Sequence, residues 1–233
     1  MLFRSYLDEA RAFRDWVLRA VAGDPANLQI MYDLAGARRL TEFELPWLPG
    51  YEGSKPVRVG NAASGQFQLD AYGEVLDAMF QSRRAGLKEA GAGWRLERAL
   101  AVFVESAWDK PDEGIWEVRG PRQHFTHSKV MAWVAIDRAI RSAEGFGLDG
   151  PVGRWRRLRT AIHRQVCRKG FDHELNSFVQ AYGSKNLDAS LLMIPHLLAG
   201  RQPRPAGAAR RGGAGLRAAA GPAQRRGPAG GGV

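Results

Sequence analysis

The strongest constraint on the fold is a series of six segments in which apolar residues recur at intervals of three and four positions. The segments begin near residues 5, 70, 94, 128, 151 and 186. Because this spacing gathers apolar side chains on one face of an α-helix, each segment predicts an amphipathic helix. Long loops separate alternate pairs of segments, which is typical of helical hairpins laid side by side. The sequence therefore predicts an all-α fold.

The connections between the helices carry local signals of their own. Asn186 is the expected N-cap of the sixth helix. Alternating segments within residues 28–43 flank a turn at residues 34–37 and predict a short β-hairpin. Residues 171–182 are expected to form a loop or a second hairpin. The long loop over residues 44–63 is rich in Gly, Pro and aromatic residues, and long ordered loops tend to line sites.

The composition changes abruptly after residue 200. Residues 201–233 contain seven arginines, no lysine, no acid and no aromatic residue, and nothing in them can bury an apolar face. We therefore expect a domain over residues 1–200 and a disordered tail over residues 201–233. One interpretation of the tail is a basic segment for an anionic partner. The favoured one is translation of GC-rich DNA in a shifted frame, because the sixth helix stops in mid-pattern after Leu198.

Several classes of partner and compartment are excluded by composition. Most of the net charge of +10 lies in the tail, so residues 1–200 are nearly balanced. Without interleaved aromatic residues the tail does not favour base stacking, and we expect no nucleic-acid partner. The apolar runs are too short to span a membrane, and the N-terminus lacks the apolar core of a signal peptide. We therefore expect no membrane partner. The single cysteine, Cys167, permits no internal disulfide, and the chain is expected to be cytoplasmic.

A carboxylate that directly follows an indole marks the segment between the third and fourth predicted helices. Glycines and prolines in residues 111–122 stop either flanking helix from running through it, so Glu117 lies in a loop. An apolar neighbour such as Trp116 disfavours the ionised carboxylate, so Glu117 could stay protonated near neutral pH and donate a proton. Breaking a glycosidic bond needs such a donor. The alternative is a core tryptophan beside a solvated charge.

Two other motifs are rejected as cofactor or metal sites. His124 and His127 are three residues apart, but no third ligand lies at a supporting spacing, so no metal is expected. Residues 145–150 match the dinucleotide-binding glycine pattern, yet they follow a helix instead of a strand and run into Pro151. The sequence therefore predicts no cofactor.

Seven short segments, in this order along residues 5–198, carry a family resemblance: Leu28-Gln29-Ile30-Met31-Tyr32, Arg39-Leu40-Thr41-Glu42, Gly60-Asn61-Ala62-Ala63, Gln68-Leu69-Asp70-Ala71-Tyr72-Gly73-Glu74, Glu113-Gly114-Ile115-Trp116-Glu117-Val118-Arg119-Gly120, His124-Phe125-Thr126-His127-Ser128-Lys129 and Leu187-Asp188-Ala189-Ser190. With them the chain resembles the glucoamylase and bacterial trehalase-like family of inverting glycoside hydrolases, family 15. The resemblance implies an (α/α)6-type toroid of helical hairpins, incomplete in this chain, whose long loops meet over a sugar pocket.

The resemblance also implies roles for individual residues. Glu117 matches the family's general acid. The implied substrate contacts are Trp116, Arg119, Arg58, Asn61 and Asp70. Trp116 would stack on a pyranose face, the arginines and Asn61 would bond sugar hydroxyls, and Arg119 would alternatively orient the acid. Structural roles remain open beside these: core packing for Trp116, folding of the long loop for Arg58 and Asn61, and a favourable helix-start charge for Asp70.

The resemblance implies only half of a catalytic site in this sequence. An inverting hydrolase also needs a carboxylate that activates water, about 6.5–9.5 Å from the acid. The family's base would follow residue 200, and its Trp-Leu-Arg-Asp sugar clamp would precede the first helix; neither occurs here. We therefore expect a fragment of a hydrolase for α-linked glucosides, either starch-type oligosaccharides or trehalose, with negligible turnover as the isolated chain. The alternative is an inactive sugar-binding or regulatory module on the same toroid.

Overall fold

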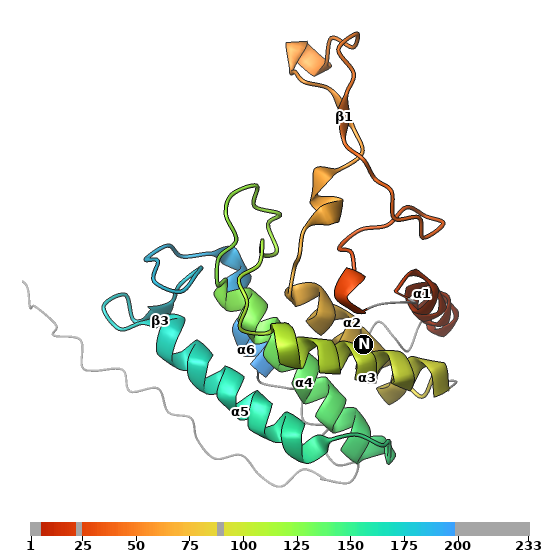
Figure 1. The fold of residues 1–233 in the computed structure, drawn as a ribbon, viewed down its shortest axis with the longest axis vertical. Helices are drawn as coiled ribbons and strands as arrows, with labels where there is room; N and C mark the ends of the chain where they lie inside the picture. The colour runs from red at the N-terminus through yellow and green to blue at the C-terminus, as the bar shows by residue number, and fades with distance from the viewer. Residues whose placement is uncertain (1–5, 22–24, 88–90, 199–233) are drawn as a thin grey trace, which may run out of the picture. The chain divides into compact units, whose positions relative to one another are not determined.

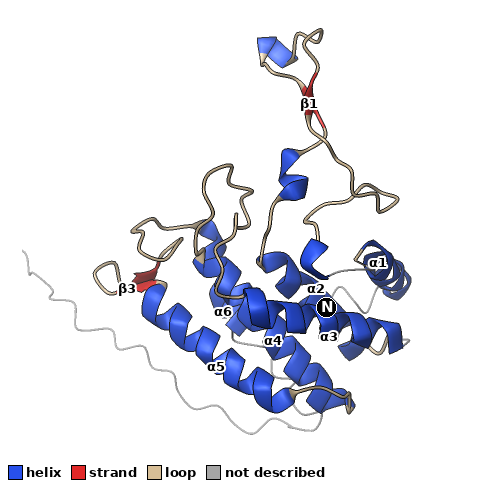
Figure 2. Ribbon diagram, in the orientation of Figure 1, coloured by secondary structure: helices blue, strands red, loops and turns tan. Residues whose placement is uncertain are grey.

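The computed structural model describes residues 6–21, 25–87 and 91–198. The domain boundary expected at residue 200, and the tail beyond it, lie outside the described residues. The described part is built from helices, with the strands confined to two short pairs (Figures 1 and 2). The predicted all-α fold is therefore confirmed. Within the described ranges, none of the helices has the length and apolarity needed to cross a membrane.

The helices follow the predicted order closely. They are α1 (Leu7–Ala20), α2 (Asp70–Arg84), α3 (Gly91–Ala107), α4 (Thr126–Phe146), α5 (Val152–Lys169) and the short α6 (Ile194–Leu198). Four 3-10 turns lie between them, namely η2 (Pro25–Asn27), η3 (Tyr51–Gly53), η4 (Ala62–Gly65) and η5 (Ala189–Met193). Pro151 directly precedes α5 as its N-cap. The start of the sixth helix differs from the prediction, because Asp188 and not Asn186 caps η5 by accepting the Ser190 amide at 2.8 Å.

Helix α4 forms the centre of the core. It is buried along most of its length and packs along α2 and α5, with further contacts to α3 and α6. Its approach to α2 is close because Gly73 has no side chain: a Cβ there would lie 2.4 Å from the Met131 carbonyl oxygen. Apolar residues at helical spacing supply the rest of the core, including Leu76, Leu100, Val104, Ile136, Trp155 and Ile162.

A buried polar cluster joins three of these helices. Arg83 of α2 donates to Glu97 of α3 through both terminal nitrogens of its guanidinium, Nη1 and Nη2, and to the Ser142 hydroxyl of α4 at 2.7 Å. The Arg83 and Glu97 side chains are almost wholly buried. Because an unpaired buried charge is costly, the three helices are constrained to the arrangement that keeps these groups together.

Three long loops meet at one end of the helices. The first loop (residues 25–69) precedes α2, the second (108–125) precedes α4, and the third (170–188) precedes η5 and α6. Each therefore delivers its last residues to the N-terminal end of a helix that packs in the core (Figure 1). Hydrogen bonds link the third loop to the second loop and to the start of α4: the Tyr182 amide donates to the His124 carbonyl at 3.0 Å, and the Thr126 amide donates to the Gln180 carbonyl at 2.8 Å.

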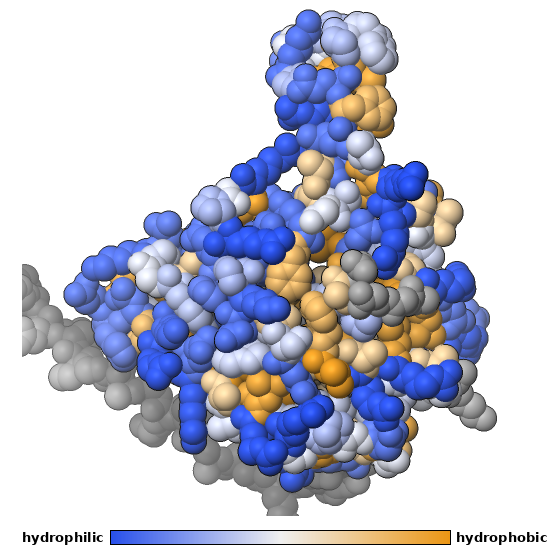
Figure 3. Space-filling model, in the orientation of Figure 1, coloured by the Kyte–Doolittle hydropathy of each residue, from blue (hydrophilic) through white to orange (hydrophobic). Residues whose placement is uncertain are grey.

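The strands lie in the loops. In the first loop β1 (Phe43–Glu44) pairs antiparallel with β2 (Arg58–Val59), with Phe43 opposite Val59. In the third loop β3 (Phe171–Asp172) pairs with β4 (Ser177–Phe178), which confirms the hairpin alternative there. The β1–β2 hairpin leads away from the helices (Figure 1) and carries exposed aromatic residues, among them Trp47 and Tyr51. On the face seen in Figure 3, hydrophilic side chains cover much of the surface and apolar ones appear between them.

The hairpin predicted within residues 28–43 is wrong. Residues 28–42 contain no strand, and the turn is organised by a side chain instead. The Asp33 carboxylate accepts the amides of Ala35 and Ala37 at 2.9 and 2.7 Å. Gln29 bonds the Arg38 carbonyl with its side-chain amide, at 3.1 Å. Side-chain bonds therefore satisfy polar groups that a β-ladder would otherwise have used.

Candidate active site

The second loop, which carries Glu117, is fastened at its base to the first loop and to itself. Asp112 and Gln123 exchange two backbone hydrogen bonds of 2.9 Å. The Glu113 amide donates to the Phe67 carbonyl at 3.1 Å, and the Glu113 carboxylate accepts the Phe67 amide at 2.9 Å. Arg122 donates to the other oxygen of Glu113 at 2.9 Å. These contacts give the two ends of the loop one fixed separation.

Two charged residues, Asp112 and Lys129, lie buried where the second loop meets the core. Both side chains are fully buried. Asp112 accepts the Leu69 amide at 3.0 Å, and the Lys129 ammonium donates to the Lys110 carbonyl. Burial raises the pKa of Asp112, despite the opposing effects of Ser128 and Lys129. Burial also lowers the pKa of Lys129 to about 8. The loop is thus anchored in a dry environment, where polar contacts are strong and costly to break.

A tight turn at the tip of the second loop presents Trp116 and Glu117. The Glu117 amide donates to the Gly114 carbonyl at 3.2 Å. Gly114 has φ of +71°, and a Cβ at this position would lie 2.6 Å from the Phe125 ring, so glycine is required. Glu117 itself has φ of +53°, in the left-handed region that residues with a side chain rarely adopt. Such strain is concentrated at functional sites, which favours a functional position for Glu117.

The surroundings of Glu117 differ from the sequence-based expectation. Trp116 is 56% exposed and Glu117 is exposed as well, so the indole does not bury the carboxylate. The reason is that the turn lies at the outer end of the loop instead of against the core. Among the described residues, the Glu117 carboxylate makes no hydrogen bond or ion pair. Its role as an acid therefore stays a prediction.

Trp116 contacts the third loop through Asp188, a residue that was not predicted as part of the site. The indole Nε1 donates to both carboxylate oxygens of Asp188, at 3.0 and 2.9 Å. Asp188 precedes an apolar segment of helical spacing, which is a helix-start signal that would have identified it as a cap. Nothing local in the sequence indicates its contact with a residue 72 positions earlier.

The two arginines predicted to bind sugar both reach Glu42, a second residue missed from the sequence. Arg119 donates to the two oxygens of Glu42 at 3.2 and 2.8 Å. Arg58 forms an ion pair with Glu42 at 3.5 Å and bonds Glu44 at 3.1 Å. The hydrogen bond from Arg119, followed by that from the Ala62 amide, lowers the pKa of Glu42. In this structure Arg119 joins the second loop to the first, and Arg58 links two segments of the first loop.

The remaining predicted contacts, Asn61 and Asp70, support loop and helix structure. The Asn61 side chain accepts the Ala63 amide at 2.9 Å and so caps η4. Asp70 is the first residue of α2 and is only 5% exposed. Burial, reinforced by the nearby charge of Asp112, raises the pKa of Asp70 to about 7. Asn61 therefore has the loop-folding role left open for it, whereas Asp70 starts α2 as a buried carboxyl whose charged form is disfavoured.

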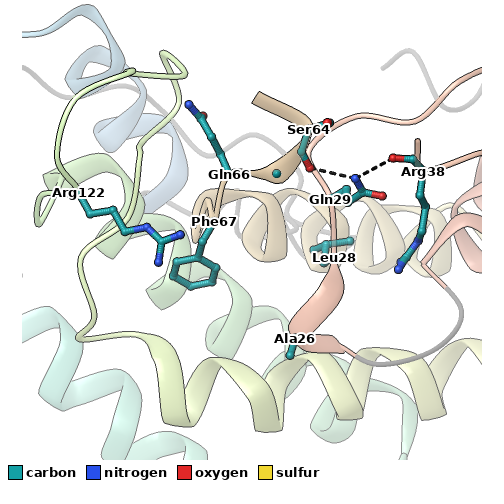
Figure 4. Close-up of a pocket in the computed structure, with 9 residues that line it drawn as sticks. Ala26, Leu28, Gln29, Arg38, Ser64, Gln66, Phe67 and Arg122 are labelled. Atoms are coloured by element: carbon teal, nitrogen blue, oxygen red, sulfur yellow. Dashed lines mark hydrogen bonds between the residues drawn. The ribbon is translucent and has the colours of Figure 1, made fainter. Parts of the chain in front are cut away.

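A cavity of about 410 Å³ lies beside the second loop (Figure 4). It is lined by Ala26, Leu28, Gln29, Arg38, Ser64, Gly65, Gln66, Phe67 and Arg122. None of the predicted site residues lines it. It is nevertheless connected to the acid-bearing turn, because the Gln66 side-chain amide donates to the Val118 carbonyl at 3.3 Å. The Arg122 guanidinium lies over the Phe67 ring, 5.6 Å from its centroid.

The fold and the site together define a class of protein. It is an all-α protein of packed helical hairpins, in which successive long loops are joined to one another at the N-terminal ends of core helices. The chain belongs to the glycosyl hydrolases family 15, whose family model matches residues 1–203. The family resemblance of the sequence is thereby confirmed.

The relatives that match the chain are trehalases. A trehalase of Thermoplasma volcanium is 43% identical over 171 residues, which are 73% of this chain and 27% of the relative. A trehalase of Mycobacterium tuberculosis is 40% identical over 167 residues, 72% of this chain and 24% of the relative. Trehalase 1 of Sulfolobus acidocaldarius is 34% identical over 202 residues, 84% of this chain and 34% of the relative. The chain thus spans about a quarter to a third of the length of these relatives.

A solved structure shares the fold. It is a glycosidase variant in complex with glucose, with a TM-score of 0.57 and 19% sequence identity. The match covers 84% of this chain and 51% of that one. At this identity the likeness concerns the helical fold.

Proposed function

We propose that this chain carries the acid-bearing part of the active site of a glycoside hydrolase that acts on α-linked glucosides by inversion. The observation that carries the proposal is Glu117, held in a left-handed conformation at the tip of a loop whose base is rigidly anchored. The family membership and the trehalase relatives support a glycosidic substrate, with trehalose favoured over starch-type oligosaccharides.

In the proposed mechanism Glu117 protonates the departing glycosidic oxygen. The preceding Trp116 offers an exposed ring for the apolar face of the sugar. The mechanism also needs a second carboxylate to activate water, about 6.5–9.5 Å away. Glu42, Glu113 and Asp188 are each engaged by an arginine or by several hydrogen bonds, so none of the three is proposed as the base.

Product stereochemistry tests this proposal. The full chain and, as a reference, the trehalase of Thermoplasma volcanium are incubated with trehalose, and the anomers of the released glucose are followed by proton NMR. Inversion releases one β-glucose and one α-glucose for each bond cleaved, whereas retention releases α-glucose alone. Formation of α-glucose alone would contradict the proposed inversion.

Calorimetry with trehalose and maltose distinguishes the proposed hydrolase from the alternative, an inactive sugar-binding module. If half of the site is present, the chain gives no product and binds trehalose too weakly for calorimetry to detect, while the reference trehalase cleaves trehalose. Heat of binding without any product would instead support the inactive sugar-binding module. Loss of both heat and NMR response in the reference enzyme under the same conditions would invalidate the assay.

A further inference from the structure

The contact between Trp116 and Asp188 fixes an aromatic ring that is otherwise open to solvent. More than half of the Trp116 surface is exposed. Its indole N–H is shared between the two oxygens of Asp188, at 3.0 and 2.9 Å. A hydrogen bond to a charged acceptor is stronger than one between neutral groups, so this contact restricts rotation of the ring while leaving its faces accessible.

Asp188 is itself held by donors on more than one side. The Gln180 side-chain amide donates to its Oδ2 atom at 2.8 Å. The Ser190 amide donates to its Oδ1 atom at 2.8 Å, and the Ser190 hydroxyl bonds the same oxygen. Burial alone would raise the pKa of Asp188, but the hydrogen bonds from Ser190, Trp116 and Gln180 lower it. The carboxylate is therefore charged and fixed in orientation at neutral pH.

The backbones that carry the two residues are fixed relative to one another. Phe125, at the end of the second loop, forms a β-bridge with Ala181 of the third loop. The hydrogen bonds from Thr126 to Gln180 and from Tyr182 to His124 lie beside this bridge. The tip that carries Trp116 is in turn closed by the turn from Gly114 to Glu117. Asp188 therefore completes a rigid connection instead of tethering a loose loop.

We infer that Asp188 is a positioning residue, which sets the orientation of Trp116 as a stacking platform for a pyranose ring. The identity of the ligand as a sugar rests on the proposed function; the fixing of the ring does not. Because Trp116 and Glu117 are adjacent in one turn, the same carboxylate also fixes the residue that precedes the proposed acid.

Indole hydrogen exchange measures the positioning directly. In the ¹⁵N-labelled full chain, the Trp116 signal is assigned among the seven tryptophans by its loss in Trp116→Phe. Trp47 is the internal reference, since it is 71% exposed and its indole makes no hydrogen bond with the described residues. We expect the Trp116 N–H to exchange at least about ten-fold more slowly than that of Trp47. Equal exchange rates in the wild-type chain would overturn the inference, whatever any variant does.

Asp188→Asn then tests the acceptor. An asparagine that keeps its oxygen toward Ser190 to cap η5 places its NH₂ group where Oδ2 accepted from Gln180 and Trp116, and Trp116 keeps only its contact with Oδ1. We expect the exchange of the Trp116 N–H to rise toward the rate of Trp47. Asp172→Asn is the matched control, because Asp172 also caps a turn in the third loop, by accepting the Glu174 and Leu175 amides. It should leave Trp116 unchanged; slow exchange retained in Asp188→Asn would contradict the inference.

An NMR titration with trehalose tests separately whether Asp188 positions Trp116 and whether the ligand of Trp116 is a sugar. If both the positioning and the sugar ligand hold, trehalose at high concentration shifts the Trp116 signal. Asp188→Asn then weakens the apparent affinity, followed on backbone amide signals, about ten-fold in the wild-type background but little in the Trp116→Phe background. Equal weakening in both backgrounds would show that Asp188 acts only as a helix cap. If trehalose shifts no indole signal while the exchange pattern holds, the positioning stands and the sugar ligand of the proposed function is overturned.

Discussion

The Glu42 carboxylate receives the Arg119 guanidinium on both of its oxygens, at 3.2 and 2.8 Å, and so joins the first loop to the acid-bearing second loop. The pair is separated by 77 residues in sequence. Asp188, in the third loop, makes a second contact with the same part of the second loop, through Trp116. The acid-bearing turn is thus tied to its neighbours in both directions, by Glu42 through Arg119 and by Asp188 through Trp116.

Glu42→Gln should loosen the tip of the second loop. Loss of the charge weakens the paired hydrogen bonds to Arg119, so amide hydrogen exchange over residues 114–122 should accelerate. Hydrogen exchange with mass spectrometry checks this. Glu44→Gln is the matched control, because Glu44 bonds Arg58 but not Arg119. Since the pKa of Glu42 is lowered, the contact should persist above that value and weaken only as the pH falls through it. Unchanged exchange in Glu42→Gln would argue against the link.

Gly114→Ala should destabilise the protein and displace the acid-bearing turn. The new Cβ would lie 2.6 Å from the Phe125 ring, at a residue with φ of +71°. Strain and overpacking together predict a loss of about 2–4 kcal/mol in the free energy of unfolding, measured by urea denaturation. Gly120→Ala, in the same loop, meets its nearest side chain at 3.5 Å and has no positive φ, so it should be nearly neutral. Similar losses in the two variants would refute this explanation.

Gly73→Ala tests the close approach of α2 and α4. The added Cβ would lie 2.4 Å from the Met131 carbonyl oxygen, and backbone cannot move aside as a flexible side chain can. We expect a loss of about 2–4 kcal/mol in the free energy of unfolding. Gly153→Ala in α5 meets nothing closer than the end of the Arg157 side chain at 3.9 Å, and should stabilise the protein by about 0.4–1 kcal/mol. A Gly73→Ala protein as stable as the wild type would contradict the packing described for α4.

Asp70→Asn should change the pH dependence of stability. The pKa of Asp70 is raised from 3.8 to about 7 in the folded protein, so the folded state binds an extra proton between these values. The wild-type free energy of unfolding therefore loses a contribution of about 2–4 kcal/mol as the pH rises from 4 to 7. The Asp70→Asn variant lacks this loss, so its free energy of unfolding should rise relative to that of the wild type over that range. Urea denaturation at pH 4.5 and 7.5 measures the difference; a constant offset between the two proteins would exclude a raised pKa.

Much of the helical framework could be predicted because its cause is local. The apolar residues of α3, such as Leu100 and Val104, recur at helical spacing and are fully buried in the structure. Gly114 and Gly120 likewise marked the second loop as a break between helices. The false hairpin over residues 28–43 arose because alternation was taken as a strand, whereas the Asp33 carboxylate closes the turn.

The missed site residues have their partners far away in sequence. Glu42 and Asp188 each lie in a segment that carried the family resemblance, yet their contacts with Arg119 and Trp116 follow only from the packing of the loops. The expected shielding of the Glu117 carboxylate by Trp116 is not found, because the same Trp-Glu pair can occur at the tip of a loop or against the core. Spacing therefore found the acid-bearing loop but not the groups that hold it in place.

The most direct measurement of the central claim replaces the proposed acid by its neutral isostere. In the intact trehalase of Thermoplasma volcanium, the residue that aligns with Glu117 is changed to Gln, and hydrolysis of trehalose is compared with that of α-glucosyl fluoride, whose leaving group needs little protonation. If Glu117 is the general acid, trehalose turnover falls by about 10²–10⁴-fold, while sugar binding remains and fluoride hydrolysis is largely retained. Unchanged trehalose turnover, or an equal loss on both substrates, would contradict the assignment.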